Sequence, residues 1–220
     1  MKLEDKLKKK KERLKNAAMR GSLFFVKWHA RGAQQDALDV ALVQAVIAGH
    51  LEIVKFLHQK GANINYKGNG GNTVLMAAVI KGFLDIVKYM HQNGANIHAV
   101  TNKGENVLFK AAVIGYLEIV RYLHQNGANI HAVTANGETA LMIAAKANHL
   151  EIVKYLHENG ADIHVRDNSG NDALLWAAKG KYPDLFRYLM RQGANPNVYN
   201  NERKTATTYF ATWKAWKDVK

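Results

Sequence analysis

Apolar and polar residues follow one another along the chain as paired helical stripes. In residues 73–81, apolar side chains recur three and four positions apart, and this first stripe consists of Val74, Leu75, Ala78 and Val79. Gly82 follows, and then comes a second stripe of Leu84, Ile86, Val87 and Met90. Gly94 ends it, because glycine adopts the left-handed conformation at a helix C-terminus without Cβ strain. The pattern predicts a helix, a short turn, a second helix and an extended loop.

This helical unit recurs at a fixed interval of 33 residues. The interval separates Gly71, Gly104, Gly137 and Gly170, and five ungapped copies run from Leu38 to Glu202. Residues 14–34 keep the same skeleton with one residue fewer, and residues 205–217 have the pattern of one further first helix. A single helix pair cannot bury both of its stripes, so the copies are expected to stack on their neighbours in one elongated domain.

The period and two short motifs resemble those of ankyrin repeats. The motifs are LEIVKYL at 150–156 in the second helix and the closing turns NGAN at 93–96 and NGAD at 159–162. The resemblance implies an all-α, ankyrin-type helical-repeat solenoid. It divides the chain into a basic segment (1–13), a degenerate capping repeat (14–37), five repeats (38–202) and a C-terminal capping helix (203–220). The T-P-L-H opening of the family's first helix is reduced to sequences such as TVLM at 73–76, so looser first-helix N-termini are expected.

Charge and composition narrow the class of protein. The chain has no cysteine, which excludes disulfides and thiolate metal sites and favours a reducing compartment, so a cytoplasmic protein is expected. The chain contains no run of about eighteen apolar residues, so no transmembrane segment is expected. The net charge of +13 is concentrated at the ends, since residues 1–20 hold nine lysines and arginines against three acids. A basic tail of this kind favours a solvated segment over a phosphate-binding one.

Histidines and polar residues offer little catalytic or metal-binding chemistry. Histidines recur at 58, 91, 124 and 157, but helices packed about 8–10 Å apart cannot bring one such column of side chains onto a single zinc ion. We therefore interpret them as half-buried packing residues. The second column, His98, His131 and His164, is expected to form hydrogen bonds across the loops between repeats. No catalytic motif or phosphate-binding loop stands out, so we expect neither an enzyme nor a cofactor.

Binding of another protein is the function that the resemblance implies. Partners of ankyrin-type proteins dock on the concave face, which is formed by the loop tips and first helices. Carried over by position, this face consists here of Ile80, Phe83, Lys103, Lys110, Ile114, Tyr116, Asn136, Lys146, His149, Trp176, Lys179 and Tyr182. Aromatic side chains with lysines at their rim are typical of binding hot spots, and the lysines favour an acidic partner. The aromatic residues also fit a second interpretation, in which they fill the groove between the two helix layers.

The sequence leaves two functional classes open. The first is a monomeric protein-interaction module that acts as an adaptor, an inhibitor or an effector in a host cytosol. The second is a nucleic-acid or anionic-membrane binder that uses its basic termini, with Lys8, Lys9, Lys10, Lys11 and Arg13 on phosphates. Near the C-terminus, the spacing of Tyr209, Phe210, Trp213 and Trp216 is helical and favours a cap on the last repeat over a membrane-surface helix.

Overall fold

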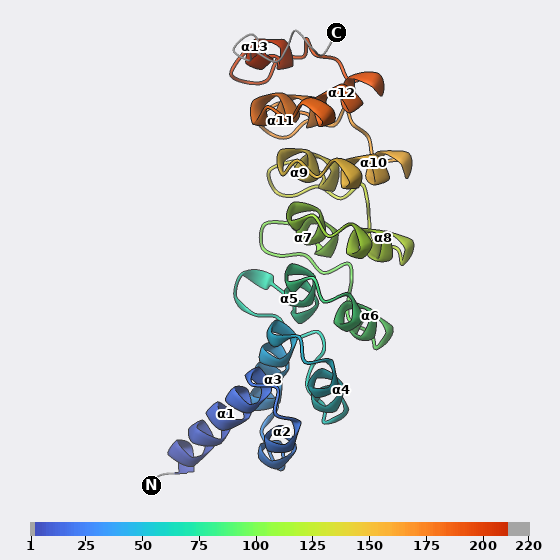
Figure 1. Cartoon of the computed structure of the whole chain (residues 1–220). Helices are drawn as coiled ribbons and strands as arrows, with labels where there is room; N and C mark the ends of the chain where they lie inside the picture. Colours follow the sequence, from blue (N-terminus) through green and yellow to red (C-terminus); the bar gives the residue numbers. More distant parts are fainter. Residues whose placement is uncertain (1–2, 211–220) are drawn as a thin grey trace. The chain divides into compact units, whose positions relative to one another are not determined.

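The computed structural model describes residues 3–210, which form helix pairs joined by long loops (Figure 1). These residues contain no strand, and two isolated antiparallel bridges, Lys67 with Thr73 and Val133 with Thr139, close loop tips. The chain divides into two compact units, Met1–Thr101 and Asn102–Lys220. The all-α, repeat-built fold expected from the 33-residue period is confirmed.

The first unit is built around the helix α3. Its elements in chain order are α1 (Leu3–Met19), α2 (Leu23–His29), α3 (Gln35–Ala48), α4 (Leu51–Gln59), the 3₁₀ turn η1 (Asn69–Gly71), α5 (Val74–Lys81) and α6 (Leu84–Gln92). α3 packs against both α1 and α5, whereas α4 lies between α2 and α6 in the second layer. The apolar stripes of both layers meet inside, where Leu14, Leu42, Leu57 and Met90 are fully buried.

The second unit repeats the same two layers. The first-helix layer holds α7 (Val107–Ile114), α9 (Ala140–Lys146), α11 (Ala173–Gly180) and α13 (Ala206–Phe210), which pack in that order. The second layer holds α8 (Leu117–Gln125), α10 (Leu150–Glu158) and α12 (Pro183–Arg191). Small residues such as Ala111, Ala144 and Ala177 are fully buried in the first-helix layer, which allows these helices to approach closely. The loop tips emerge beside this layer (Figure 1).

Four first helices, α5, α7, α9 and α11, begin with well-formed caps, contrary to the looser N-termini expected from the missing T-P-L-H opening. Thr73 accepts a hydrogen bond from the backbone N–H of Met76 at 3.2 Å, and Asn106 accepts one from Phe109 at 3.0 Å. Thr139 and Asp172 make the same bond. Each side chain satisfies one of the backbone N–H groups that have no partner within the helix, a bond worth about 1 kcal/mol. The opening motif has changed, but the capping oxygen has been kept.

The basic N-terminal residues form part of a packed helix. α1 runs without interruption from Leu3 to Met19, so the segment boundary expected at residue 13 falls inside it. Lys10 donates to the backbone carbonyls of Arg31 and Gly32, and Lys11 forms an ion pair with Asp36 at 2.7 Å. Of the lysines expected in a solvated tail, Lys10 thus attaches α1 to the loop that precedes α3, and Lys11 attaches it to the first turn of α3.

At the other end, the structure describes only the first turn of the expected C-terminal cap. α13 packs on α11, and the side chain of Tyr209 is half-buried. Trp213 and Trp216, which complete the aromatic stripe expected here, lie outside the described residues.

Candidate partner-binding surface

Trp176 and two lysines form the most distinctive cluster on the first helices of the second unit. The half-buried indole of Trp176 projects from α11, one turn before Lys179 on the same helix. The ammonium nitrogen of Lys146, at the C-terminus of α9, lies 4.3 Å from the ring centroid, and that of Lys179 lies 5.2 Å from it. Both distances are within the range of cation–π attraction, which contributes about 0.5–1 kcal/mol at exposed sites. The structure thus brings together three residues that the sequence placed on this surface.

The indole is held in place by the loop that precedes its helix. Its Nε1 donates to Asp167 at 3.1 Å, and the same carboxylate accepts the backbone N–H groups of Ser169 and Asn171, each at 2.9 Å. Asp167 is buried, so these bonds compensate for the cost of removing its carboxylate from water. Trp176 is therefore presented in one orientation before any partner arrives, which reduces the entropy lost on binding.

The loop tips of the second unit are joined into a hydrogen-bonded ladder. At each step a backbone N–H of one tip donates to a carbonyl of the preceding tip: Ala135 to Lys103, Asn168 to Asn136, and Asn201 to Ser169. The Asn168 side chain adds a 3.0 Å bond to the Ala135 carbonyl, and the Asn201 side chain a 3.0 Å bond to the Asn168 carbonyl. The tips that carry the expected contacts Lys103 and Asn136, both exposed, therefore stand on a continuous network.

Two residues of the aromatic stripe, His149 and Tyr182, precede second helices and pack on first helices of the second unit. In the second unit, a Cβ added at Gly115 would lie 2.5 Å from Cε1 of His149, and Nε2 of His149 lies 3.2 Å from the Val113 carbonyl. Tyr182 covers Gly180, and its hydroxyl reaches the Lys146 carbonyl at 3.5 Å. These contacts support the groove-filling interpretation of the stripe.

The first unit shows the same packing at two positions. A Cβ added at Gly49 would lie 2.7 Å from Cζ of Phe83. His50, in the same register one period earlier, lies against Gly21, with its Nε2 3.3 Å from the Met19 carbonyl. The 33-residue period could have identified His50 as part of the stripe, but the sequence reasoning omitted it.

The remaining residues expected to contact a partner differ in how exposed their side chains are. Ile80, in the first unit, is 40% exposed, whereas Ile114 and Tyr116, in the second, are half-buried. Lys110 forms an ion pair with Glu105 at 2.5 Å, and its side chain retains only 18% of its exposure. Lys146 also has a carboxylate neighbour, Glu138, at 3.2 Å, but it stays 50% exposed. Of these two lysines, Lys146 is therefore the one more accessible to a partner.

The two histidine columns behave differently. Nδ1 of His124 is hydrogen-bonded to the Tyr155 hydroxyl at 2.9 Å, and His58 with Tyr89 and His157 with Tyr188 form the same bond. These half-buried histidines join neighbouring second helices, as their interpretation as packing residues required. Within the described part of the chain, no group of three or more His, Cys, Asp or Glu side chains is placed to hold a metal ion.

The expectation for the second histidine column was wrong. His98, His131 and His164 are exposed, and in each loop the side chain two residues earlier accepts the histidine's own backbone N–H, as Asn96 does for His98 at 2.8 Å. The expected bond between loops is made by Asn65, one period before His98: its side chain donates to the Gly94 carbonyl and accepts from the Asn96 N–H. An amide both donates and accepts at this distance from the backbone, whereas the longer imidazole turns outward.

Comparison with known proteins covers most of the chain. A model described as ankyrin repeats in three copies matches residues 14–101 and 108–200, and one described as ankyrin repeats in many copies matches residues 84–124. The comparison with curated proteins found no match. No helix among residues 3–210 is both long and apolar enough to cross a membrane. The matched repeats, the helix pairs and the glycine-terminated turns agree, and the chain belongs to the ankyrin repeat family.

Proposed function

We propose that this chain binds an acidic segment of a partner protein on the surface formed by the first helices and loop tips of its second unit. Ankyrin repeats in general mediate protein–protein interactions, which supports a binding role of this class. The observation that carries the specific proposal is the stack of Lys146, Trp176 and Lys179. A tryptophan flanked by cations offers a partner both apolar area and charge.

The chemistry of this stack favours a carboxylate-bearing partner. Both ammonium groups lie against one indole, so an acidic side chain placed beside the ring can approach two cations at once. The carboxylate of Glu138 already neutralises part of the charge of Lys146, and a partner must compete with it. The lysine of this pair is 50% exposed, so a partner can reach its ammonium group, whereas the Glu138 side chain is only 17% exposed. Lys103 and Asn136 extend the surface along the tip ladder.

An affinity pull-down with mass spectrometry tests the proposal. Binding is compared at about 0.15 M and about 0.5 M salt, because exposed ion pairs weaken as the screening length shortens. Trp176→Ala and the double variant Lys146→Gln/Lys179→Gln remove the apolar and the charged part of the stack. The matched control, Lys154→Gln/Arg187→Gln, removes two positive charges from the second helices α10 and α12 instead.

The proposal predicts a protein that both stack variants fail to retain and the control retains, with stronger binding at the lower salt concentration. Equal retention by all four proteins would refute it. Recovery of nucleic acid alone, insensitive to the stack variants and lost at high salt, would instead support binding through the basic termini.

A further inference from the structure

The second helix of the N-terminal repeat carries an unusual aromatic face. Phe24, Phe25 and Trp28 on α2 are 71%, 54% and 62% exposed, whereas the neighbouring Val26 is fully buried. Large aromatic side chains stabilise a fold mainly by burial, so three exposed ones on a single short helix are not explained by the packing of the first unit. An exposed apolar patch of this kind with a polar rim is typical of an interaction site.

The repeat register shows what this face corresponds to. Counting from the first leucine of each second helix, Phe25 occupies the position of Ile53 and Ile86, which are 2% and 0% exposed. Trp28 occupies the position of Tyr89, whose hydroxyl bonds to His58 of the preceding second helix. Positions three apart share one face of a helix, so this face is the one that a preceding helix covers in later repeats. In α2 this face has no second helix before it among the described residues, and α1 and Arg31 cover it only in part.

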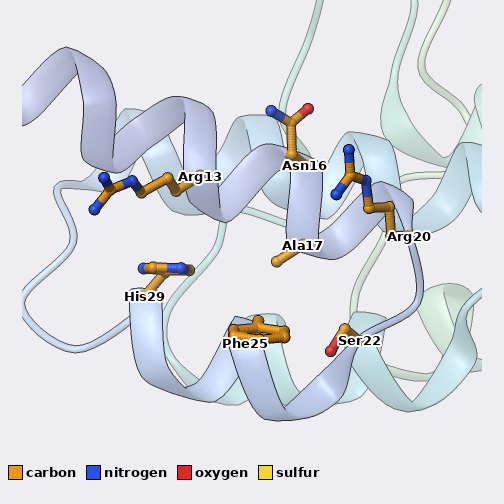
Figure 2. A pocket seen from close by; sticks show the side chains of 7 residues that line it. All are labelled: Arg13, Asn16, Ala17, Arg20, Ser22, Phe25 and His29. Carbon is orange, nitrogen blue, oxygen red and sulfur yellow. The ribbon is translucent and has the colours of Figure 1, made fainter.

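A groove between α1 and α2 runs along this face (Figure 2). It has a volume of about 380 Å³, and it is lined by Arg13, Asn16, Ala17 and Arg20 from α1 and by Ser22, Phe25 and His29 from α2. Figure 2 shows Ala17 and Phe25 facing each other at the middle, with Arg13 and His29 at one end and Arg20 and Ser22 at the other. The groove thus has an apolar centre and an arginine at each end.

The charge around the groove is strongly positive. Residues 1–34 contain eleven lysines and arginines and three acidic residues. Beside Trp28, a second hollow is lined by Lys6, Lys9, Lys10, Arg13 and His29. Burial and, after it, the neighbouring charges of Arg13 and Lys10 lower the pKa of His29, as expected for a ring in a positive potential.

We propose that this N-terminal face, formed by Phe24, Phe25 and Trp28 with Arg13 and Arg20, docks an acidic amphipathic helix of a partner protein. The partner helix takes the place of a preceding second helix: its apolar stripe covers Phe25 and Trp28, and its carboxylates meet the two arginines. Charge complementarity selects this occupant, because a second copy of the chain would bring an equally basic face. A bilayer fits less well, since Phe25 lines a groove opposite the arginine-bearing wall of α1.

Fluorescence anisotropy with labelled peptides and the full chain tests this inference. The probes are synthetic helices of about 20 residues, long enough to be partly helical alone, with glutamates around an apolar stripe of Leu, Phe or Trp. Scrambled peptides of equal composition without a continuous stripe are the controls. Phe25→Ser/Trp28→Ser and Arg13→Gln/Arg20→Gln are expected to weaken binding by about tenfold or more, the usual effect of losing hot-spot residues. All four side chains line the surface, and circular dichroism verifies that both variants fold.

Two further proteins make the result specific. Lys81→Gln/Lys204→Gln removes two exposed charges outside the groove and should bind like the parent chain. Lys154→Gln should also bind normally, because Lys154 lies on the second helix α10 and belongs to neither proposed surface. The inference would be overturned if none of the striped helices binds, if scrambled peptides bind equally well, or if the Phe25 and Trp28 variant binds unchanged. It would likewise be overturned if only vesicles of phosphatidylcholine and phosphatidylserine bind in a Phe25- and Trp28-dependent manner.

Discussion

The packing of His149 on Gly115 gives a quantitative test of whether the aromatic stripe belongs to the scaffold. Gly115 caps α7 with a φ of +98°, and Gly127 follows α8 with a φ of +92°. Alanine at either position would lower the free energy of unfolding by about 1–2 kcal/mol, because its Cβ is strained in the left-handed conformation. A Cβ at Gly127 meets nothing within 4 Å, whereas a Cβ at Gly115 would lie 2.5 Å from the imidazole of His149. Displacing a half-buried ring adds an overpacking cost of about 1–3 kcal/mol.

Gly115→Ala should therefore lower the free energy of unfolding by about 1–3 kcal/mol more than Gly127→Ala. In a His149→Ala background the clash is absent, and the two glycine substitutions should cost the same. Urea unfolding followed by circular dichroism measures all four variants, and equal slopes with denaturant show that the comparison is valid. The reasoning is refuted if Gly115→Ala and Gly127→Ala are equally destabilising beside the native His149. It is also refuted if the excess persists after His149 has been removed, because the cost would then not arise from the ring.

Three further predictions concern single contacts. Burial raises the pKa of Asp172, so its native carboxyl holds its proton more tightly than in the unfolded chain, and stability should fall as pH rises through its titration range. Asp172→Asn keeps a capping oxygen and should remove this fall in melts between about pH 3 and 7, and Asp172→Ala should be less stable than Asp172→Asn by about 0.5–2 kcal/mol at any pH. Tyr155→Phe removes the bond to His124 and should cost about 0.5–1.5 kcal/mol in urea unfolding, and no loss would show that the bond is replaced by water. Lys11→Gln should raise the pKa of Asp36, which Lys11 lowers through its hydrogen bond, and an unchanged NMR titration would contradict that contact.

The sequence alone was sufficient for the repeat architecture. A stripe with helical spacing and a glycine after it are local features, because helix formation and left-handed turns depend on residues within a few positions of one another. The structure has the first helix of residues 73–81 at Val74–Lys81, ending at Gly82 with a φ of +77°. Repetition of these signals in five phased copies determined which elements would stack.

The candidate site could be predicted only in outline. Position in the repeat placed Trp176 and Lys146 on the first-helix surface, but the distance between them does not follow from the repeat. The stack depends on the separation of α9 and α11 and on the bond from the indole to Asp167, which the sequence reasoning did not foresee. Lys110 was placed on the same surface as Lys146 by its position in the repeat, yet its side chain is paired with Glu105 and is only 18% exposed.

The local pattern thus determined the helices, their turns and their order, whereas tertiary packing decided which side chains remain available. Phe25 and Ile53 hold the same register position, and periodicity treats them alike. Phe25 is 54% exposed, whereas Ile53, on a helix packed between α2 and α6, is 2% exposed. Asn65 and His98 likewise share a position, and only the shorter amide reaches the neighbouring loop. Whether a side chain is buried depends on the residues that pack against it, and the repeat period alone does not say which residues those are.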